Sequence, residues 1–481
     1  TAPKQKPLID ETTQPRDNPR VMSPFDAGNL ILLACLMVVI GALGVSAAVS
    51  RGGLVGAGVG TVMIAGLARL SLDAQGVTDV LAALLLIAIG LGLGYFLFAR
   101  RRWPRHGLVV LVAGLTAAGA YERTFRLDEV LAATERRLQP DVRYYQQQAL
   151  RTVNPFAAGE KSPLWPALNA PIVRASSRPD DAMRWLSWLF GIAMIPAVGL
   201  TFAALLSGAA GVIVASCLAF EPWLIDLCTE GLREEAGVTL WMLVLWLALG
   251  RPQLSLGRTL ATGVAGGVLL LLRNISVLPL FAVLLLLLVQ RRVRPLHAPA
   301  LLGLPILLVL PFYVNQYRVH GDPFWMEKRD ARYHANIEFS RTTAPAGLTM
   351  PTPEEWRTSL FAGEPLSPLA YLLKYHSFGE FARRQWEGAT NIVLGRPFMT
   401  MYSAWFRLAC TLGLIAAAAA VRTRWMPLFV LACVVGVPAH LYSLNQLEQR
   451  LLLPVLVIWL AAGTHLLVEV ARRAYAKVET A

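Results

Sequence analysis

Charged residues and cysteines are scarce in this sequence of 481 residues. Only 16% of the residues are charged, 55% are hydrophobic, and the mean hydropathy is +0.51. This balance excludes the two or three soluble domains that the length alone would predict. The 5 cysteines are an odd number and most lie inside apolar runs, which excludes a disulfide framework and a Cys-x-x-Cys metal site. The composition indicates an integral membrane protein.

Nucleotide-binding and repeat signatures are also missing. The chain has no Gly-x-Gly-x-x-Gly or Walker-type loop and no repeated unit of about 20 to 50 residues. Its formal net charge is +13, which in a soluble protein would indicate a nucleic-acid partner. In a membrane protein the same excess is typical of arginine-rich cytoplasmic loops, so no nucleic-acid partner is expected.

Long apolar runs are abundant instead. A membrane-crossing helix needs roughly 20 mainly apolar residues, and the sequence contains about thirteen such runs. They are predicted at 27–48, 53–70, 79–99, 107–121, 184–206, 208–226, 237–250, 258–273, 275–290, 298–316, 402–421, 425–443 and 451–470. The polar, proline-rich segment 1–26 before them has no early apolar core of the kind found in signal peptides, and it is predicted to be a disordered tail.

Two long polar stretches, 122–183 and 317–400, interrupt the spans, and strict alternation places both on the same side of the membrane. The short loops on the opposite side are rich in arginine, so the positive-inside rule makes that side cytoplasmic and the long loops external. We expect a bacterial inner (cytoplasmic) membrane with the active face periplasmic. Four leading spans would put the basic tail outside as well; the alternative is that one of these runs does not cross.

The resulting fold class is an all-α, polytopic helical bundle with short interfacial helices in the two external loops. It has five parts: the tail 1–26, three extra N-terminal transmembrane helices in 27–106, a core in 107–316 that includes the first external loop, the external loop 317–400, and three C-terminal transmembrane helices with a cytoplasmic tail in 401–481. The prolines at 140 and 155 favour short helices along the membrane in the first loop.

Carboxylates gather at the external edge of the membrane in two places. In the first, Asp141 is a candidate general base for an acceptor hydroxyl or amine, with Asp128 and Glu129 as alternative acids. In the second, Glu230 and Glu234 stand at helical i, i+4 spacing beside Arg233. Placing ionisable groups at the membrane edge costs free energy, so a cluster of them there indicates a functional role. The structural alternatives are solvation, ion pairing and helix capping.

Three arginines lie at the outer ends of apolar helices: Arg273, Arg318 and Arg450. A guanidinium group presents a fork of donors that fits phosphate oxygens. Together with the acidic loops, these arginines predict an anion-binding cavity capped by carboxylates, suited to a lipid phosphate. For any single arginine the alternative is a side chain that reaches the lipid headgroups without further function.

These residues, in this order, resemble the GT-C superfamily of membrane glycosyltransferases, specifically the protein O-mannosyltransferase and aminoarabinose transferase type. The motifs that carry the resemblance span 107–470: Arg-Thr-Phe-Arg-Leu-Asp (123–128), Pro-Asp-Val-Arg-Tyr-Tyr (140–145) with Ala149, Asn-Pro-Phe (154–156), Pro-Leu-Trp-Pro (163–166), Leu-Leu-Arg (271–273) after Gly266 and Gly267, the segment 311–324, and Glu448 and Arg450 with Pro454. The chain departs from the family at Asp141-Val142, where the family has Asp-Glu, and at Asn315-Gln316, where it has Arg-Asn.

The resemblance implies a glycosyltransferase of the dolichyl-phosphate-mannose type. It would move a sugar, with inversion, from a polyprenyl phosphate to an acceptor protein, lipid or glycan on the external face. Asp141 would take the proton of the acceptor, and the lipid phosphate would be held by Arg273, Arg318 and Arg450. The remaining predicted site residues are Glu230, Arg233 and Glu234, which complete the pocket, and Tyr145, Lys161 and Glu448, which support it. A divalent cation, Mg²⁺ or Mn²⁺, is left open.

Three other functions remain open. A catalytically inactive GT-C-like structural or accessory subunit of a membrane complex is favoured by Val142 in place of the second acid. A transporter would carry ionisable groups in the middle of its helices, whereas nearly every charge here lies at a helix end. A polysaccharide polymerase or ligase would concentrate its key residues in one large late loop, whereas Asp141 lies early in the chain.

Overall fold

The computed structural model describes residues 105–133, 138–159, 161–326, 360–361, 364–365, 377–380, 382–383, 450 and 453–480. The predicted tail, the spans up to residue 99, the spans 402–421 and 425–443, and Glu448 lie outside these residues. The predictions for them stay predictions.

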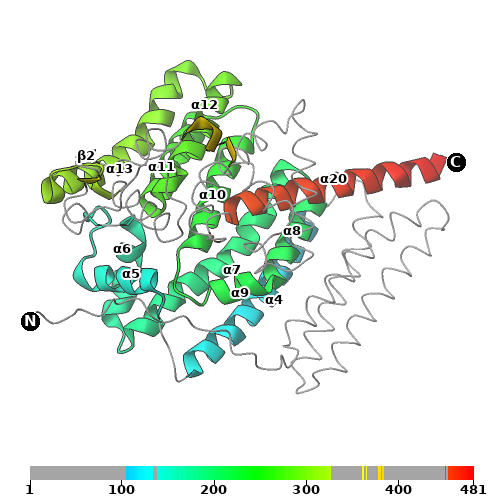
Figure 1. The fold of residues 1–481 in the computed structure, drawn as a ribbon. Helices are drawn as coiled ribbons and strands as arrows, with labels where there is room; N and C mark the ends of the chain where they lie inside the picture. The colour runs from blue at the N-terminus through cyan, green and yellow to red at the C-terminus, as the bar shows by residue number, and fades with distance from the viewer. Residues whose placement is uncertain are drawn as a thin grey trace, which may run out of the picture.

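Helices dominate the part of the chain that the structure describes (Figure 1). They are α4 (Arg105–Ala132), α5 (Pro140–Arg151), α6 (Leu164–Ala175), α7 (Pro179–Leu205), α8 (Gly208–Phe220), α9 (Pro222–Leu227), α10 (Glu234–Leu249), α11 (Leu256–Leu272), α12 (Val277–Val289), α13 (Ala298–His320) and α20 (Leu453–Thr480). The 3-10 turns η1 (Asn274–Ser276) and η2 (Pro295–His297) precede α12 and α13, and the strands β1 (Leu360–Phe361) and β2 (Glu364–Pro365) pair antiparallel. The predicted helical membrane fold is confirmed.

Three of the described helices are long and apolar enough to cross a membrane: Leu108–Ala132, Pro179–Leu205 and Pro295–His320. Shorter apolar helices cover Gly208–Phe220, Leu256–Leu272, Asn274–Val289 and Leu453–His465. Each of these helices overlaps a span predicted from the sequence. The protein is therefore an integral membrane protein.

The loop predicted to begin at residue 122 begins later, because α4 continues to Ala132. Arg123, predicted in that loop, is fully buried inside the helix bundle. Its guanidinium donates to the carbonyl oxygens of Leu218 at 2.8 Å and Ala219 at 2.9 Å. These are among the last carbonyls of α8, which lack partners within their own helix. Arg123 thereby ties the extended α4 to the end of α8.

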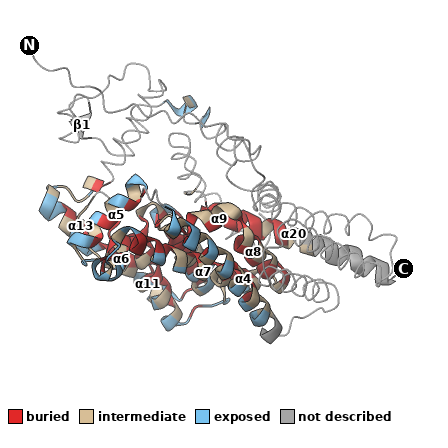
Figure 2. Cartoon of the chain, turned by 90° about the horizontal axis from the view of Figure 1, so that it is seen from below, coloured by how far each residue is buried: buried red, intermediate tan, exposed pale blue. Residues whose placement is uncertain are grey.

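Helix α7 lies at the centre of the bundle and packs against α4, α8 and α10, while α11 packs against α10 and α13. Small residues allow the closest approach: a Cβ on Gly211 would lie 2.3 Å from the carbonyl oxygen of Gly199. Figure 2 shows the buried residues gathered where α7, α8, α9 and the start of α20 meet. The outer faces of α4, α11 and α13 are more exposed.

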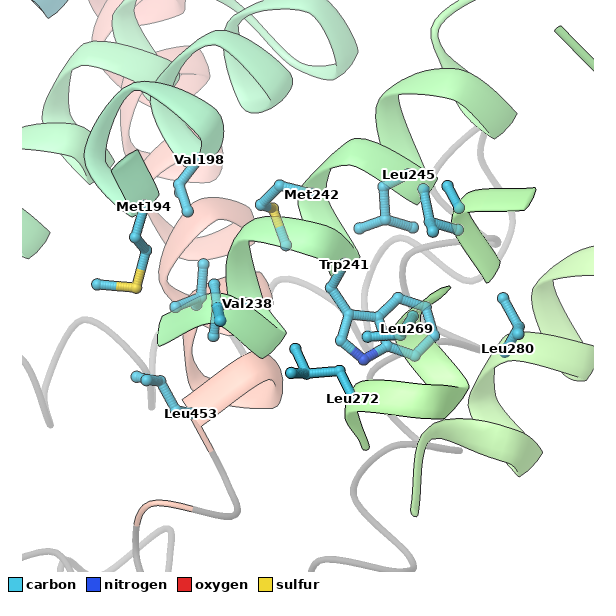
Figure 3. Close-up of a cluster of buried hydrophobic side chains, with 14 of the residues drawn as sticks. Met194, Val198, Val238, Trp241, Met242, Leu245, Leu269, Leu272, Leu280 and Leu453 are labelled. Atoms are coloured by element: carbon cyan, nitrogen blue, oxygen red, sulfur yellow. The ribbon is translucent and has the colours of Figure 1, made fainter. Parts of the chain in front are cut away.

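The start of α20 is anchored in this core. Leu453 is fully buried and belongs to the same apolar cluster as Val238 of α10 and Met194 of α7 (Figure 3). Residues Val455–Ala461 are buried as well. This anchoring fixes Arg450, three residues before Leu453, at the edge of the bundle.

The short helices α5 and α6 form a separate layer, as the prolines of the first loop predict. Pro140 occupies the first turn of α5, where its fixed φ suits a helix start. Trp165 of α6 is fully buried, and its indole Nε1 donates to the carbonyl oxygen of Gly231 at 3.2 Å. Gly231 has φ +86°, and a Cβ there would lie 2.9 Å from Cγ1 of Val142. The layer therefore docks on the turn between α9 and α10.

Candidate anion-binding site

Asp141 lies in the first turn of α5 and is held by two cations. Lys161, in the loop between α5 and α6, donates from Nζ to Oδ1 of Asp141. Arg450 donates from Nη2 to Oδ2 of Asp141 at 2.6 Å. Both oxygens of the carboxylate are therefore engaged by side chains that are distant in the sequence.

Arg450 also faces the acid that opens α10. Its Nε lies 3.9 Å from Oε1 of Glu234, whose relative exposure is 4%. The second carboxylate oxygen of Glu234, Oε2, accepts no hydrogen bond from the residues that the structure describes. Arg450 thus links the carboxylate of α5 to the carboxylate of α10.

Tyr145 stands one turn after Asp141 and packs against two cations, Lys161 again and Arg233. The guanidinium carbon of Arg233 lies 5.4 Å from its ring centroid, and Nζ of Lys161 lies 5.6 Å from it. Both distances fall within the roughly 6 Å reach of cation–π attraction. Arg233 also donates to the carbonyl oxygen of Leu272 at 2.9 Å, at the end of α11.

Arg273 follows α11 directly and is almost fully buried, with a relative exposure of 3%. A Cβ on Gly237 would lie 2.8 Å from its Cδ, so α10 leaves room for the arginine only because residue 237 has no side chain. Among the described residues, Nη1 of Arg273 has no hydrogen-bond partner. A buried donor without a partner is costly, which favours a ligand that accepts from it.

Positive charge exceeds negative charge at this place. We call these six residues the basic cluster. It contains four cations, Lys161, Arg233, Arg273 and Arg450, and two acids, Asp141 and Glu234. Four cations against two carboxylates leave a formal charge of about +2 in a partly desolvated site. An anion with several oxygen acceptors, such as a phosphate group, complements this charge and the arginine geometry.

The cations dominate the ionisation of Asp141. Burial raises its pKa, but Lys161 and Arg450 outweigh burial and lower the pKa to about 2. Asp141 is therefore ionised at neutral pH and a weak proton acceptor while both cations hold it. Burial raises the pKa of Tyr145 above its ordinary value, so its hydroxyl stays neutral.

The loop that carries Lys161 is held on two sides. Asn315 donates from Nδ2 to the carbonyl oxygen of Phe156 at 2.9 Å, and Gln316 donates from Nε2 to that of Gly159 at 2.8 Å. On the other side of Lys161, the hydroxyl oxygen of Ser162 accepts from the backbone N–H of Asn274 at 3.3 Å. Asn315 and Gln316 thus fasten this loop to the end of α13.

A cavity of about 310 Å³ lies beside the basic cluster and contains the other acidic turn. Its lining residues are Arg126, Val130, Gln139, Arg184, Asp226, Thr229 and Glu230. Within it, Gln139 donates to Oε2 of Glu230 at 2.8 Å, and Arg126 donates to Oδ1 of Asp226 at 2.7 Å. Glu230, predicted as part of the pocket, faces this cavity. Arg126 belongs to the motif 123–128 but was not predicted as a site residue, and no sequence signal marked Gln139 or Arg184.

Three predicted residues lie elsewhere among the described helices. Asp128 and Glu129 are exposed on α4, and Glu129 pairs with Arg126 at 2.9 Å. Arg318 is exposed near the end of α13 and forms no hydrogen bond or ion pair with the basic cluster. The helix phase explains this, because Gln316 faces the interior and two residues turn a helix by about 200°. Lys161 and Arg233 supply the additional cations instead.

The described residues also bear on the divalent cation that the sequence left open. In this part of the chain no three His, Cys, Asp or Glu side chains gather in a metal-binding arrangement. Both oxygens of Asp141 are already engaged by Lys161 and Arg450. The divalent cation stays a prediction.

Comparisons with known proteins give two similar solved structures, both of the oligosaccharyltransferase of Archaeoglobus fulgidus. The complex with zinc and sulfate is 12% identical, with a TM-score of 0.43, and the match covers 77% of this chain and 50% of that one. The form tethered to an acceptor peptide containing the NVT sequon is 13% identical, with a TM-score of 0.41, covering 78% and 50%. This chain spans about half the length of those proteins, and similarity at this level carries no argument about function.

No family model matches the sequence, and no curated protein matches it. What the fold and the site define is a class: a helical membrane protein with a buried, positively charged site at the ends of its apolar helices.

Proposed function

We propose that this protein is a membrane glycosyltransferase that takes a sugar from a polyprenyl phosphate donor and passes it to an acceptor on the external face. The observation that carries the proposal is the basic cluster, in which four cations surround two carboxylates at the ends of apolar helices. The motif order that resembles the GT-C superfamily supports the same assignment, with inversion at the anomeric carbon.

The charge of the cluster suits the leaving group better than the donor. A sugar phosphodiester carries one negative charge, whereas the free phosphate monoester carries about −1.5 to −2 near neutral pH. When the bond from the anomeric carbon to the phosphate oxygen breaks, its electron pair remains on the phosphate. A site of about +2 charge stabilises this growing charge in the transition state more than the charge of the bound donor.

We assign Arg273 and Arg450 as the main phosphate ligands, with Lys161 and Arg233 beside them. Asp141 is proposed to position Lys161 and Arg450 before the donor arrives. The donor phosphate would then compete with Asp141 for the same two cations. The proton-accepting role predicted for Asp141 requires this exchange, since its pKa is about 2 while both cations hold it.

One observation favours a second candidate, an accessory subunit without catalysis. Val142 stands where the GT-C pattern has its second acid, and its side chain is fully buried against Gly231. The position therefore contributes to packing and offers no carboxylate. In an accessory subunit the basic cluster would bind lipid without catalysing a reaction.

A deletion strain separates the two functions. We expect deletion to change the mass of a cell-surface glycan, and the wild-type gene to restore it. Arg273→Gln should fail to restore the product at equal protein level, while Arg318→Gln, an exposed arginine outside the cluster, should restore it. Full restoration by Arg273→Gln would overturn the enzymatic proposal and favour the accessory subunit.

A further inference from the structure

The cavity beside the basic cluster is almost entirely polar. Of its seven lining residues only Val130 is apolar. The others bring paired donors and acceptors from α4, the start of α5, α7 and α9, among them the Arg126–Asp226 ion pair. Such a surface suits a group with several adjacent hydroxyls and does not suit a lipid chain or an apolar peptide side chain.

Two short links connect this cavity to the basic cluster. Gln139, which donates to Glu230, stands two residues before Asp141 at the start of α5. Glu230 stands four residues before Glu234, whose carboxylate faces Arg450. A group bound in the cavity therefore lies next to a phosphate bound at Arg450.

We propose that this cavity is the acceptor subsite, that it takes one hydroxyl-bearing sugar residue of the acceptor, and that Glu230 accepts the proton of the attacking hydroxyl. The inference rests on the proposed function and names its acceptor class and its base. The volume of about 310 Å³ lies at the lower end of the roughly 300–1,000 Å³ typical of ligand pockets, which fits a single ring.

The surroundings of Glu230 suit proton transfer at neutral pH. Burial raises the pKa of Glu230, and the nearby carboxylates of Glu234 and Asp226 raise it further. Arg450 and Arg184 lower it, and the resulting pKa is about 7. The amide of Gln139 faces the same carboxylate. A base is most effective when its pKa is near the working pH, whereas Asp141, with a pKa of about 2, accepts a proton weakly.

The proposed step is balanced. The hydroxyl oxygen of the acceptor forms a bond to the anomeric carbon, and the bond from that carbon to the phosphate oxygen breaks with its electron pair left on the phosphate. The proton of the hydroxyl moves to the carboxylate of Glu230. Glu230 then returns it to water through the open side of the cavity, and the phosphate remains at the basic cluster.

The first experiment separates Glu230 from the donor site. Purified protein is tested for binding of undecaprenyl phosphate by native mass spectrometry, and product formation is followed in membrane vesicles from the deletion strain. We expect Glu230→Gln to bind the lipid like wild type but to form product at least about 100-fold more slowly, the size of a general-base contribution. Glu230→Asp should retain part of the rate. Asp128→Asn, at an exposed position on α4, should match wild type.

The pH dependence gives a second readout. Product formation by wild type should rise with pH through about 7, as the carboxyl of Glu230 loses its proton. The residual rate of Glu230→Gln should lack this rise. A wild-type rate in Glu230→Gln, with transfer abolished only by Asp141→Asn, would overturn the inference and return the proton to Asp141. Failure of wild type to bind undecaprenyl phosphate would overturn the proposed function itself.

The acceptor class is tested without the donor. Val130→Cys places a thiol at the cavity, and its alkylation by a maleimide is timed with and without methyl glycosides. We expect the glycosides to slow alkylation of Val130→Cys, and Glu230→Leu in the same background to abolish this protection. Equal alkylation rates with and without every glycoside would overturn the assignment of a sugar acceptor.

Discussion

Nη2 of Arg450 lies 2.6 Å from Oδ2 of Asp141, although 309 residues of sequence separate them. This ion pair joins the start of α5 to the segment before α20. Because Leu453 is fully buried in the core, Arg450 approaches Asp141 from a fixed base. Asp141 thus serves as the counter-charge of two cations that we assign to the donor phosphate.

The stability of the protein should depend on the ionisation of Asp141. Its pKa is lowered from 3.8 to about 2, so the carboxylate stabilises the folded state above about pH 4, and this stabilisation is lost as the pH falls toward 2. The contribution is about 2 kcal/mol. Asp141→Asn should lose this pH-dependent part in thermal unfolding of the detergent-solubilised protein. Asp128→Asn, whose carboxylate is exposed, should keep it.

Gly231→Ala should destabilise the docking of α5 and α6. Residue 231 has φ +86°, and a Cβ there would lie 2.9 Å from Cγ1 of Val142 and 3.2 Å from the carbonyl oxygen of Met183. Gly321→Ala is the matched control, because φ is +69° and a Cβ there would meet nothing within 4 Å. We expect about 1 kcal/mol of backbone strain for the control and about 1–3 kcal/mol more at residue 231 from overpacking. Equal melting temperatures for the two variants would contradict this packing.

Gln316→Met should loosen the loop that carries Lys161. The substitution keeps the approximate size of the side chain but removes the 2.8 Å hydrogen bond to the carbonyl oxygen of Gly159. Limited proteolysis within residues 152–163 should become faster, and the affinity for undecaprenyl phosphate should fall a few-fold. Gln290→Met, at an exposed position at the end of α12, is the control. Unchanged proteolysis in Gln316→Met would show that Gln316 does not hold the loop that carries Lys161.

Gly237→Ala should displace Arg273 without changing any charge. The new Cβ would lie 2.8 Å from Cδ of Arg273, so the arginine has to move. Gly303→Ala, inside α13, adds a Cβ that meets nothing within 4 Å and should be neutral or slightly stabilising. We expect only Gly237→Ala to weaken binding of undecaprenyl phosphate, measured by native mass spectrometry. Equal affinities in both variants would show that the position of Arg273 does not matter for binding.

The sequence predicts the helices well because apolar runs and prolines determine them. It misses the extension of α4 to Ala132, where the buried polar contacts of Arg123 and the buried side chain of Leu127 hold the helix against the bundle. It places Asp141, Arg273 and Arg450 at one edge through motif order and topology. The amides of Gln139, Asn315 and Gln316 carry no periodic signal, so their roles become visible only from their hydrogen bonds.

Arg318 illustrates the limit of reasoning from position in the chain. Its place at the end of α13 predicts a phosphate ligand. Membrane topology, however, predicts only how deep a residue lies in the membrane and not which side of the helix its side chain is on. The inward face of α13 belongs to Gln316, which is fully buried, and Arg318 faces outward. Lys161, which lies in a loop rather than at a helix end, pairs directly with Asp141, as Arg450 does.

The most direct test of the central claim is the affinity of the purified protein for undecaprenyl phosphate, compared between wild type, Arg273→Gln and Arg318→Gln. We expect binding by wild type, a loss of at least about tenfold in Arg273→Gln, which corresponds to about 1.4 kcal/mol, and no change in Arg318→Gln. Equal binding by wild type and Arg273→Gln would contradict the assignment of the basic cluster as the lipid phosphate site.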